Sequence, residues 1–446
     1  MGQRGQTLTQ VLGYRGWRVV EVSYERVDGT KVTPVAGYDL PQELLLVLRT
    51  ERRWVGRCAE CQAICGRVHE QLPPRRWADL SWAGRPTVIE YAPQRLACRR
   101  CGHTGVELLA WADTHQRQTR RLQHYLAIET ASMPVQHVAA LHGLDWSTVK
   151  RAEVCALERW QKTRQKVPLR HVGIDEKYLG RRSRHRKEKF VTIFSNLETG
   201  EPLAIEFGRS EETVTAWLQT LTKEEKAGIT LFSMDMHQAF LNAVRADPDL
   251  AHAVVVHDPF HVMKRVGAAL DELRREVFFR AGPDQRRLGR GKRWLYLRSW
   301  ERCSEDQRTE LRDFLKLNRT LARGYQLAEE IRAALHAPDR GAMWTAINRV
   351  LLRTSRRDNV PLRKLHESLL RHWPQLLGLA DHRPATGRVE ALNNNWETLV
   401  RRSRGHRDLD YLLLKLRFMV ANPIRSANGV ARFRALGLPA PIKLAA

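Results

Sequence analysis

Cysteine is scarce in this sequence of 446 residues, and long hydrophobic runs are absent. Seven unevenly spaced cysteines are too few for a disulfide-rich secreted scaffold. No run approaches the roughly 18 apolar residues that a membrane-spanning helix needs. The segment from Met1 to Leu12 is polar and lacks the apolar core of a signal peptide. We therefore expect a cytoplasmic protein with no membrane partner.

Acidic residues are also in short supply. Asp and Glu number 49 against 75 Lys and Arg, so the formal net charge is +26. The basic residues are spread over the whole chain, which is typical of an extended surface for a polyanion. No amphipathic anchor or lipidation motif favours an anionic membrane, so nucleic acid is the expected partner. The length predicts two to four domains, and a hydrophobic fraction of 43% is enough for buried cores.

Four of the seven cysteines form two C-x-x-C pairs, Cys58-Ala-Glu-Cys61 and Cys98-Arg-Arg-Cys101. Four thiolates in two such pairs predict a closed, tetrahedral, structural zinc site. The long gap between the pairs requires an intervening hairpin, for which residues 77–80 and 87–91 are the candidate strands. The alternative is that the four residues are ordinary buried thiols. Further ligand candidates nearby are Cys65, His69 and His103.

Residues 134–151 have the layout of a helix-turn-helix. Ala139 is small enough for the helices to cross closely, Gly143 suits the turn, and Leu144 and Val149 fit a shared core. Asp145 is placed to cap the second helix. The outward positions of this helix, where a recognition helix meets the major groove, are Ser147, Thr148, Lys150 and Arg151. The alternative is a plain helical hairpin.

Residues 168–265 change to runs of β-branched and aromatic residues. The predicted strands are residues 171–178, 190–196, 203–207, 229–234 and 253–257. The first three must be antiparallel because their links are too short for crossovers. A helix capped by Ser210 follows, after which the strand at 229–234 can run parallel to the first. This is the RNase H-like order, and it would place Asp175 and Asp235 on neighbouring strands.

From Phe260 to about Arg383 the pattern is helical, with apolar residues repeating on shared faces. The tryptophans of this segment are expected in its core rather than as base-stacking platforms; they are Trp294, Trp300, Trp344 and Trp373. Glu390 then opens another helix, which runs into the basic stretch Arg401-Arg402-Ser-Arg404-Gly405-His-Arg407. A last apolar helix is predicted at residues 411–419.

Three carboxylates stand out by position. Asp175 and Asp235 each end an apolar run, and Glu390 opens a helix. Together they could gather hard divalent cations, because magnesium prefers oxygen ligands and usually takes one or two carboxylates plus substrate phosphates. Alternatives remain for each residue. Glu176 follows Asp175 but points to the opposite face of a strand, Asp235 could merely cap a helix, and Glu397 lies on roughly the same helix face as Glu390.

In combination, these motifs resemble the DDE transposases of bacterial insertion sequences, specifically the ISL-three family. The resemblance covers nearly the whole chain. It comprises the paired cysteines, the helix-turn-helix, the acids Asp175 and Asp235, the segment Asp258-Pro-Phe-His261, and the helix Glu390-Ala-Leu-Asn393-Asn394 with its trailing arginines. Each motif is weak alone, but their order and the long helical segment before Glu390 make the combination specific.

The resemblance implies DNA strand cleavage and strand transfer at terminal inverted repeats, with Asp175, Asp235 and Glu390 as ligands of two Mg²⁺ or Mn²⁺ ions. Asp258 and His261 would support these acids or position DNA, although Asp258 could equally cap the helix that starts at Phe260. Arginines that offer bidentate phosphate contacts are Arg401, Arg402, Arg404 and Arg407.

The family likeness further implies double-stranded DNA as substrate, both the inverted repeats and the target, and a homodimer associated with the bacterial nucleoid. Two other functions fit parts of the pattern. One is a DNA-binding regulator with a degenerate catalytic domain, and the other is an RNase H-like nuclease that cuts but does not join.

The expected fold is therefore a multidomain α/β protein. It has an RNase H-like mixed sheet with a large all-helical insertion, preceded by a zinc-binding module and a helix-turn-helix. The predicted boundaries are residues 1–112 for the zinc-binding domain, 113–166 for the helix-turn-helix, 167–265 and 387–446 for the two parts of the catalytic domain, and 266–386 for the insertion.

Overall fold

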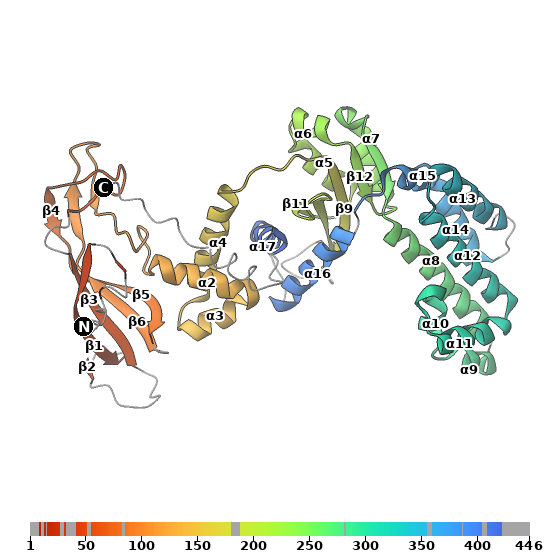
Figure 1. Ribbon diagram of the computed structural model, residues 1–446, viewed down its shortest axis with the longest axis horizontal. Coiled ribbons are helices and arrows are strands. Elements are labelled where there is room, and N and C mark those ends of the chain that lie inside the picture. Colours follow the sequence, from red (N-terminus) through yellow and green to blue (C-terminus); the bar gives the residue numbers. More distant parts are fainter. Residues whose placement is uncertain are drawn as a thin grey trace, which may run out of the picture. The chain divides into compact units, whose positions relative to one another are not determined.

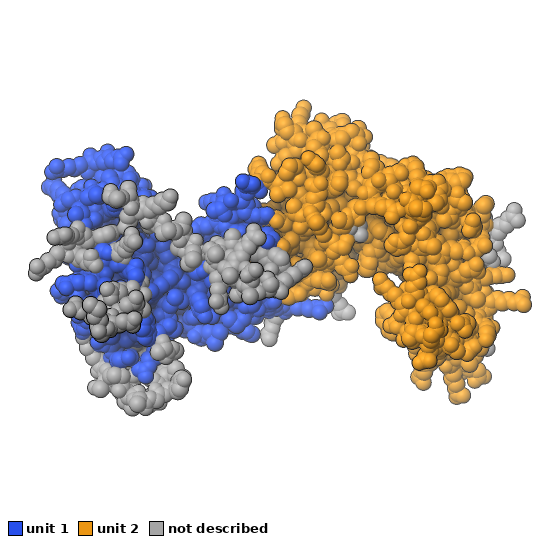
Figure 2. Space-filling view, in the orientation of Figure 1, with its two compact units in different colours: residues 1–165, 400–405, 421–446 blue, residues 166–399, 406–420 orange. Residues whose placement is uncertain are grey.

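A computed structural model gives the fold of the chain (Figure 1). The residues that it describes are 9, 13–14, 16–26, 31–32, 42–50, 55–82, 85–179, 188–280, 282–354, 359–385, 387–403 and 408–421. The chain divides into two compact units, coloured separately in Figure 2. Unit 1 comprises residues 1–165, 400–405 and 421–446, and unit 2 comprises residues 166–399 and 406–420.

Unit 1 begins with β-structure. Its strands are β1 (Trp17–Arg26), β2 (Lys31–Val32), β3 (Gln42–Thr50), β4 (Val68–Gln71), β5 (Arg75–Trp82), β6 (Arg85–Tyr91), β7 (Gln94–Ala97) and β8 (Thr104–Val106). They form a five-stranded sheet in the order β2-β1-β3-β6-β5 and a three-stranded sheet in the order β4-β7-β8. The predicted hairpin between the cysteine pairs is confirmed as β5 and β6, and it belongs to the larger sheet.

Three helices complete the described part of unit 1. They are α2 (Arg120–Ser132), α3 (Val135–His142) and α4 (Trp146–Lys162). The buried carboxylate of Asp79 in β5 ties the first of them, α2, to the sheet. It accepts hydrogen bonds from the Thr119 hydroxyl (2.6 Å), from the Tyr14 hydroxyl (3.2 Å) and from the Arg121 guanidinium. Because two of these donors lie at the start of α2 and the third, Tyr14, precedes β1, this one acid fixes the start of α2 against the sheet.

Unit 2 is built on a second five-stranded sheet. Its strands are β9 (His171–Tyr178), β10 (Phe190–Asn196), β11 (Pro202–Phe207), β12 (Leu231–Met234) and β13 (Val254–His257), in the order β11-β10-β9-β12-β13. The first three are antiparallel, whereas β12 runs parallel to both β9 and β13. The predicted strands and their directions are therefore confirmed.

Two amphipathic helices, α5 (Glu211–Gln219) and α7 (Gln238–Ala246), cover one face of this sheet. Phe194 of β10 stacks on Trp217 of α5 with ring centroids 4.0 Å apart. As predicted, the Ser210 hydroxyl caps α5. A short helix that the sequence did not suggest, α6 (Lys223–Gly228), lies between α5 and β12 and carries a capping box from Thr222 and Glu225.

The helical segment after β13 packs onto the sheet rather than forming a separate core. Its α-helices are α8 (Pro259–Arg274), α9 (Pro283–Gly289), α10 (Arg293–Leu297), α11 (Glu305–Lys316), α12 (Arg319–Leu335), α13 (Arg340–Thr354), α14 (Val360–Arg371) and α15 (Trp373–His382). A π-helical turn at Arg275–Phe279 follows α8, and a short 3-10 helix at Trp300–Arg302 follows α10. Leu231 and Val256 of the sheet belong to the same apolar cluster as these helices.

The tryptophan prediction is only half right. Trp300 and Trp373 pack against the core of the helical segment. Trp294 and Trp344 do not, because 69% and 53% of their surfaces are exposed. Hydrophobic residue type alone could not separate the two pairs.

Two more helices close the described chain, α16 (Gly387–Arg402) and α17 (Leu409–Ala421). Residues 387–399 of α16 belong to unit 2, where Val389 approaches Gly173 of β9. A Cβ atom at Gly173 would lie 3.5 Å from Val389, but only 2.6 Å from the Ser195 hydroxyl and 2.8 Å from Leu197. Glycine is therefore required at this position of β9, two residues before Asp175.

Candidate active site and DNA-binding elements

Asp175 and Asp235 lie on neighbouring strands, as the sequence predicts. Ile174 of β9 pairs with Met234, the last residue of β12, in parallel register, so the residue that follows each of them in the chain is one of the two acids. Both carboxylates face one imidazole. The His261 Nε2 atom lies 3.4 Å from an Asp175 oxygen, and its Nδ1 atom lies 3.2 Å from an Asp235 oxygen. His261 thus bridges the two acids from the first turns of α8.

Asp175 and Glu176 point in opposite directions, as alternation along a strand requires. Glu176 forms an ion pair with Arg209 at 3.1 Å. Asp175 instead accepts a hydrogen bond from the Asn393 amide at 2.9 Å and lies 3.1 Å from the Lys177 ammonium. Of the two adjacent acids, Asp175 is the one that faces the Asp235 side.

The charges in this cluster stabilise one another. Burial raises the pKa of Asp175, but its hydrogen bond to His261 and the charge of Lys177 outweigh burial, and the pKa falls to about 2. The pKa of Asp235 is also lowered, because the hydrogen bond and charge of His261 outweigh burial. Burial opposes protonation of His261, but the two carboxylates raise its pKa to about 9.

Two ionised carboxylates at adjacent strand ends are a suitable donor set for a hard divalent cation, which would compete with the cationic His261 for their oxygens. Their oxygens come from adjacent strand ends, and magnesium needs only one or two protein carboxylates when a phosphate supplies the rest. The residues present therefore fit the magnesium that the family likeness implies.

Asp258 has the capping role left open by the sequence. Its carboxylate accepts the Phe260 backbone N–H at 2.9 Å and so caps α8. Burial raises the pKa of Asp258. Because the cap fixes the first turn of α8, it also fixes His261 between Asp175 and Asp235.

Sequence reasoning missed Arg265, one turn after His261 on α8. Its guanidinium donates to the Met236 carbonyl, next to Asp235, and to the Ser368 hydroxyl of α14 at 3.2 Å. The i, i+4 spacing from His261 was the available signal, but α8 carries several basic residues and nothing in the pattern distinguished this one.

Glu390 is not brought into the acidic pair. Its side chain is exposed in the first turn of α16, and Glu397 is exposed one turn beyond Asn393. Asn393, between the two in sequence, is the residue of this helix that reaches Asp175. Within the described ranges, one group of three or more potential ligands gathers within 4.8 Å, and it consists of cysteines. Asn393 therefore connects α16 to Asp175. The positions of Glu390 and Glu397 do not show which of them would be the third metal ligand.

A buried imidazole pair lies behind Asp235. His257, at the end of β13, and His372, at the start of α15, are 2.9 Å apart from Nε2 to Nδ1. The other nitrogen of His257 lies 3.4 Å from the Met234 carbonyl. If Nδ1–H of His257 donates to that carbonyl, its Nε2 must accept from His372. Protonating His257 at Nε2 would then place two N–H groups face to face.

We expect this pair to make stability depend on pH. Burial lowers the pKa of both imidazoles to about 4, whereas an unfolded chain titrates near 6.5. Between about pH 4 and 6.5 the unfolded state therefore binds more protons than the folded state, and the free energy of unfolding decreases as the pH falls through this range. A shift of this size corresponds to about 3 kcal/mol for one imidazole.

Thermal melting across that range measures the effect. His372→Gln keeps a donor for His257 but removes one titrating group, so its melting temperature should fall less with acid than that of the wild type. His252, an exposed imidazole of unit 2, provides the control, and His252→Gln should behave like the wild type. Parallel acid profiles for His372→Gln and the wild type would contradict the assignment.

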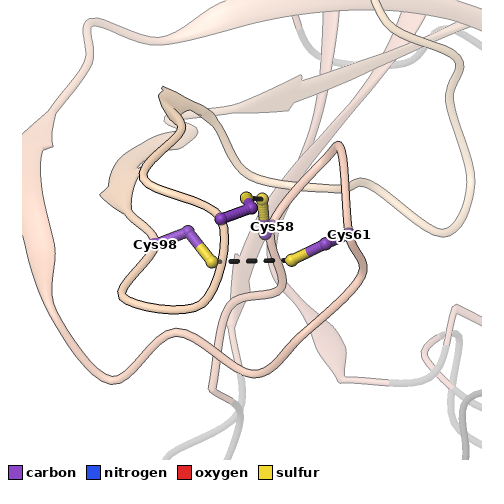
Figure 3. A group of neighbouring side chains, drawn as sticks. Cys58, Cys61 and Cys98 are labelled. Atoms are coloured by element: carbon purple, nitrogen blue, oxygen red, sulfur yellow. Dashed lines mark hydrogen bonds between the residues drawn. The ribbon is translucent and has the colours of Figure 1, made fainter.

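The two cysteine pairs come together in unit 1. The sulfur atoms of Cys58, Cys61, Cys98 and Cys101 all lie within 4.8 Å of one another. Cys61 and Cys98 are 3.5 Å apart, as drawn in Figure 3, and Cys58 and Cys101 are 3.7 Å apart. Hydrogen bonds from the backbone N–H groups of Cys101 and Arg100 help lower the pKa of Cys98 to about 6. Such a group fits a tetrahedral metal ion.

The other ligand candidates stay outside this cluster. Burial raises the pKa of Cys65 to about 11, and its thiol donates to the Ala63 carbonyl at 3.6 Å. His69 and His103 are not part of the four-sulfur group. The two C-x-x-C pairs therefore come together as the sequence predicts, while their role as metal ligands and the identity of the metal stay predictions.

Helices α3 and α4 form the predicted helix-turn-helix. Gly143 adopts a left-handed conformation with φ of 61° at the turn, while Ala139 and Val149 are buried in one cluster with Leu144 packed against it. Asp145 occupies the N-cap position of α4, but its side chain makes no capping hydrogen bond. The prediction of a side-chain cap was therefore wrong, and the backbone carbonyl of Asp145 begins the helix instead.

The outward positions of α4 differ in exposure. Ser147 and Arg151 are exposed, whereas Thr148 and Lys150 are half-buried. Trp146, which sequence reasoning passed over, is exposed at the start of the same helix, and the Lys150 ammonium lies over its ring at 5.5 Å. An aromatic residue at the start of the second helix of a helix-turn-helix was the available signal.

The basic stretch after Glu390 is described only in part. Arg401 is exposed, and Arg402, which belongs to unit 1, donates to the Ala131 carbonyl at 2.8 Å. Arg404 and Arg407 lie outside the described residues.

No helix in the described ranges is long and apolar enough to cross a membrane.

Comparison with known families identifies the class of protein. A family model described as transposase matches residues 172–416, and a model described as the helix-turn-helix domain of transposase family ISL3 matches residues 107–153. The first match covers the sheet with Asp175 and Asp235, the helical segment and α16. The chain is therefore a transposase by family.

Its curated relatives agree. The chain is 28% identical over 370 residues to the transposase for insertion sequence element IS1001 of Bordetella parapertussis, covering 81% of this chain and 87% of the relative. It is 24% identical over 394 residues to the transposase for insertion sequence element IS1557 of Mycobacterium tuberculosis, covering 80% and 84%. The chain belongs to transposase family ISL3, the family that its motifs resemble.

Proposed function

We propose that this transposase binds the terminal inverted repeats of an insertion sequence and catalyses DNA strand cleavage and strand transfer. The observation that carries the proposal is the convergence of Asp175 and Asp235 on His261 from adjacent parallel strands. The order β11-β10-β9-β12-β13, with three antiparallel strands followed by two parallel ones, is the RNase H-like arrangement that we propose for this domain.

Asp175, Asp235 and Glu390 are the residues that would hold two Mg²⁺ or Mn²⁺ ions. When bound, such ions activate the attacking water or 3′-hydroxyl and stabilise the leaving oxygen of the phosphodiester. The protein contributes the arrangement of the ligands. Asn393 orients Asp175 by its amide hydrogen bond, and Arg265 fixes the carbonyl that follows Asp235. His261 keeps both aspartates ionised.

Incubation of the purified protein with Mg²⁺ and labelled element ends tests the proposal. Joined products are expected from a transposase. Cleavage without joining would indicate an RNase H-like nuclease, and binding without cleavage would indicate a DNA-binding regulator. Membership of a transposase family, and the presence of all three acids, favour the first outcome.

The choice of the third acid makes a separate prediction. Glu390→Gln should lower the rate of end cleavage by about 10³-fold, because a lost ligand charge removes several kcal/mol of transition-state stabilisation. Glu397→Gln changes a similarly exposed acid of the same helix and should leave cleavage close to wild type. Single-turnover cleavage of labelled ends measures both. The reverse ranking would assign the third ligand to Glu397.

We also propose roles for the DNA-binding elements. The helix-turn-helix would read the inverted repeat through Ser147, Thr148, Lys150 and Arg151, and the cysteine cluster would hold a structural Zn²⁺. The arginines from 401 to 407 would contact phosphates. The predicted organisation into four domains, action as a homodimer on paired ends, and a cytoplasmic location at the nucleoid are parts of the same proposal.

A further inference from the structure

A large groove opens beside the candidate active site within unit 2. It has a volume of about 1270 Å³ and is lined by residues of α8, α10, α12 and the segment from Arg298 to Arg302. Pockets for single small molecules usually span about 300–1,000 Å³. The volume of this groove exceeds that range, so it offers room for part of a chain molecule. Figure 1 labels the three helices that border it.

Two exposed aromatic rings lie in this groove. Phe260 exposes 62% of its surface and Trp294 exposes 69%. A single exposed apolar side chain is common at a protein surface, but exposed apolar side chains that share one groove mark a binding surface. Neither ring is part of the apolar core of the helical segment.

Both rings are held in place by their neighbours. The Asp258 cap fixes the Phe260 backbone, and the Phe260 ring packs edge-to-face on His261 at 5.6 Å. The Arg293 guanidinium lies over the Trp294 ring at 4.5 Å and is itself paired with buried Asp271 at 3.2 Å. One aromatic platform thus touches the residue that bridges the two catalytic aspartates, and the other lies further along the groove.

Positive charge accompanies the rings. Arg298, Arg302 and Arg332 line the groove, against Glu301 and Glu329. Arg332 is paired with Glu329, and Arg298 donates to Gln307 at 2.8 Å. Arg302 is exposed, and the part of the chain that the structure describes offers its guanidinium no hydrogen-bond or ion-pair partner. An anionic ligand would supply one.

We propose that this groove binds unpaired nucleotides of the DNA substrate, with bases stacking on Phe260 and Trp294 and phosphates contacting Arg302 and Arg298. Aromatic platforms combined with a basic groove are the general means of holding single-stranded nucleic acid. A duplex does not offer its base faces, so the nucleotides must be unpaired. The inference rests on the proposed function for its substrate, because Phe260 of the groove packs against His261 of the candidate active site.

The test uses the full-length protein and a short oligo-dT strand carrying one 2-aminopurine, whose fluorescence falls when the base stacks. The wild type should bind and quench this probe. Trp294→Ala should weaken binding by about tenfold or more, the loss expected for one stacking contact, whereas Trp294→Phe should retain most of it. Phe260→Ala should behave like Trp294→Ala.

Trp344→Ala is the matched control, since Trp344 is another exposed tryptophan of the helical segment, on α13 and outside the groove. It should bind the probe like the wild type. Equal affinity of Trp294→Ala and the wild type would overturn the inference. A change of oligomeric state in Trp294→Ala without a change in probe binding would also overturn it, and would make the groove a protein interface.

These readouts are independent of cleavage. If Trp294→Ala cleaves DNA ends and binds the probe like the wild type, the proposed function is supported and the proposed role of the groove in binding nucleotides is rejected. Conversely, the protein could cut no DNA end and still bind the probe in a way that depends on Trp294. That result would support nucleotide binding in the groove and count against the proposed cleavage and strand transfer.

Discussion

Asp175→Asn should abolish detectable end cleavage while DNA binding remains. The substitution preserves the shape of the side chain but removes the charge that would hold a divalent cation, and losing about 4 kcal/mol of transition-state stabilisation corresponds to a ~10³-fold lower rate. Asp175 lies in unit 2, away in sequence from the helix-turn-helix at residues 134–151, so affinity for the inverted repeat should be unchanged. Single-turnover cleavage and gel-shift titration measure the two properties.

Glu176→Gln is the control for this variant. Glu176 is the adjacent acid, but it faces Arg209 on the opposite side of β9, and its loss removes a half-exposed ion pair of the kind worth about 1 kcal/mol or less. Cleavage should therefore stay near wild type. If Asp175→Asn retains cleavage, or if Glu176→Gln is folded but loses cleavage, the catalytic role would belong to Glu176 instead of Asp175.

Cys98→Ser should remove the metal from unit 1 and unfold the small β4-β7-β8 sheet. The buried apolar cluster around this site consists of Cys58, Cys65, Leu96 and Cys98, so little besides the ligands holds it together. Structural zinc contributes about 10–16 kcal/mol to folding in small domains. Metal analysis should find about one zinc per wild-type chain and almost none in the variant, with new protease cleavage between residues 55 and 110.

Cys65→Ser tests whether the effect is specific to the four ligands. Cys65 is as buried as Cys98, at 5% exposure for each, but its thiol bonds to a backbone carbonyl and belongs to no ligand group. This variant should keep its zinc and its resistance to protease. Zinc loss in Cys65→Ser, or zinc retained in Cys98→Ser, would show that the ligand set is different.

The strands of unit 2 could be predicted from sequence because local pattern and topology agree there. Runs such as residues 171–178 are apolar and β-branched, and short links leave antiparallel pairing as the only choice for the first three. The parallel pairing of β12 with β9 then follows, and with it the approach of Asp175 to Asp235. The cysteine cluster was predictable for a similar reason, since C-x-x-C spacing encodes the local geometry of a metal knuckle.

Other features depend on contacts that sequence does not encode. The bridging position of His261 results from the direction in which α8 leaves β13, which no local pattern specifies. Trp294 and Trp344 look like core residues by type, yet they are exposed because other side chains fill the interior of the helical segment. Asp145 illustrates a local failure, since a residue with high capping preference holds the cap position without using its side chain.

The hydrogen bond between Asn393 and Asp175 joins residues 218 positions apart, and this separation affects the order in which the protein matures during translation. The ribosome releases the cysteine cluster, the helix-turn-helix and Asp175 long before α16 emerges. A nascent or truncated chain that ends before residue 387 would therefore carry the cysteine cluster and the helix-turn-helix without α16 and α17. We expect such fragments to occupy the element's ends without cutting them and to compete with the full-length protein.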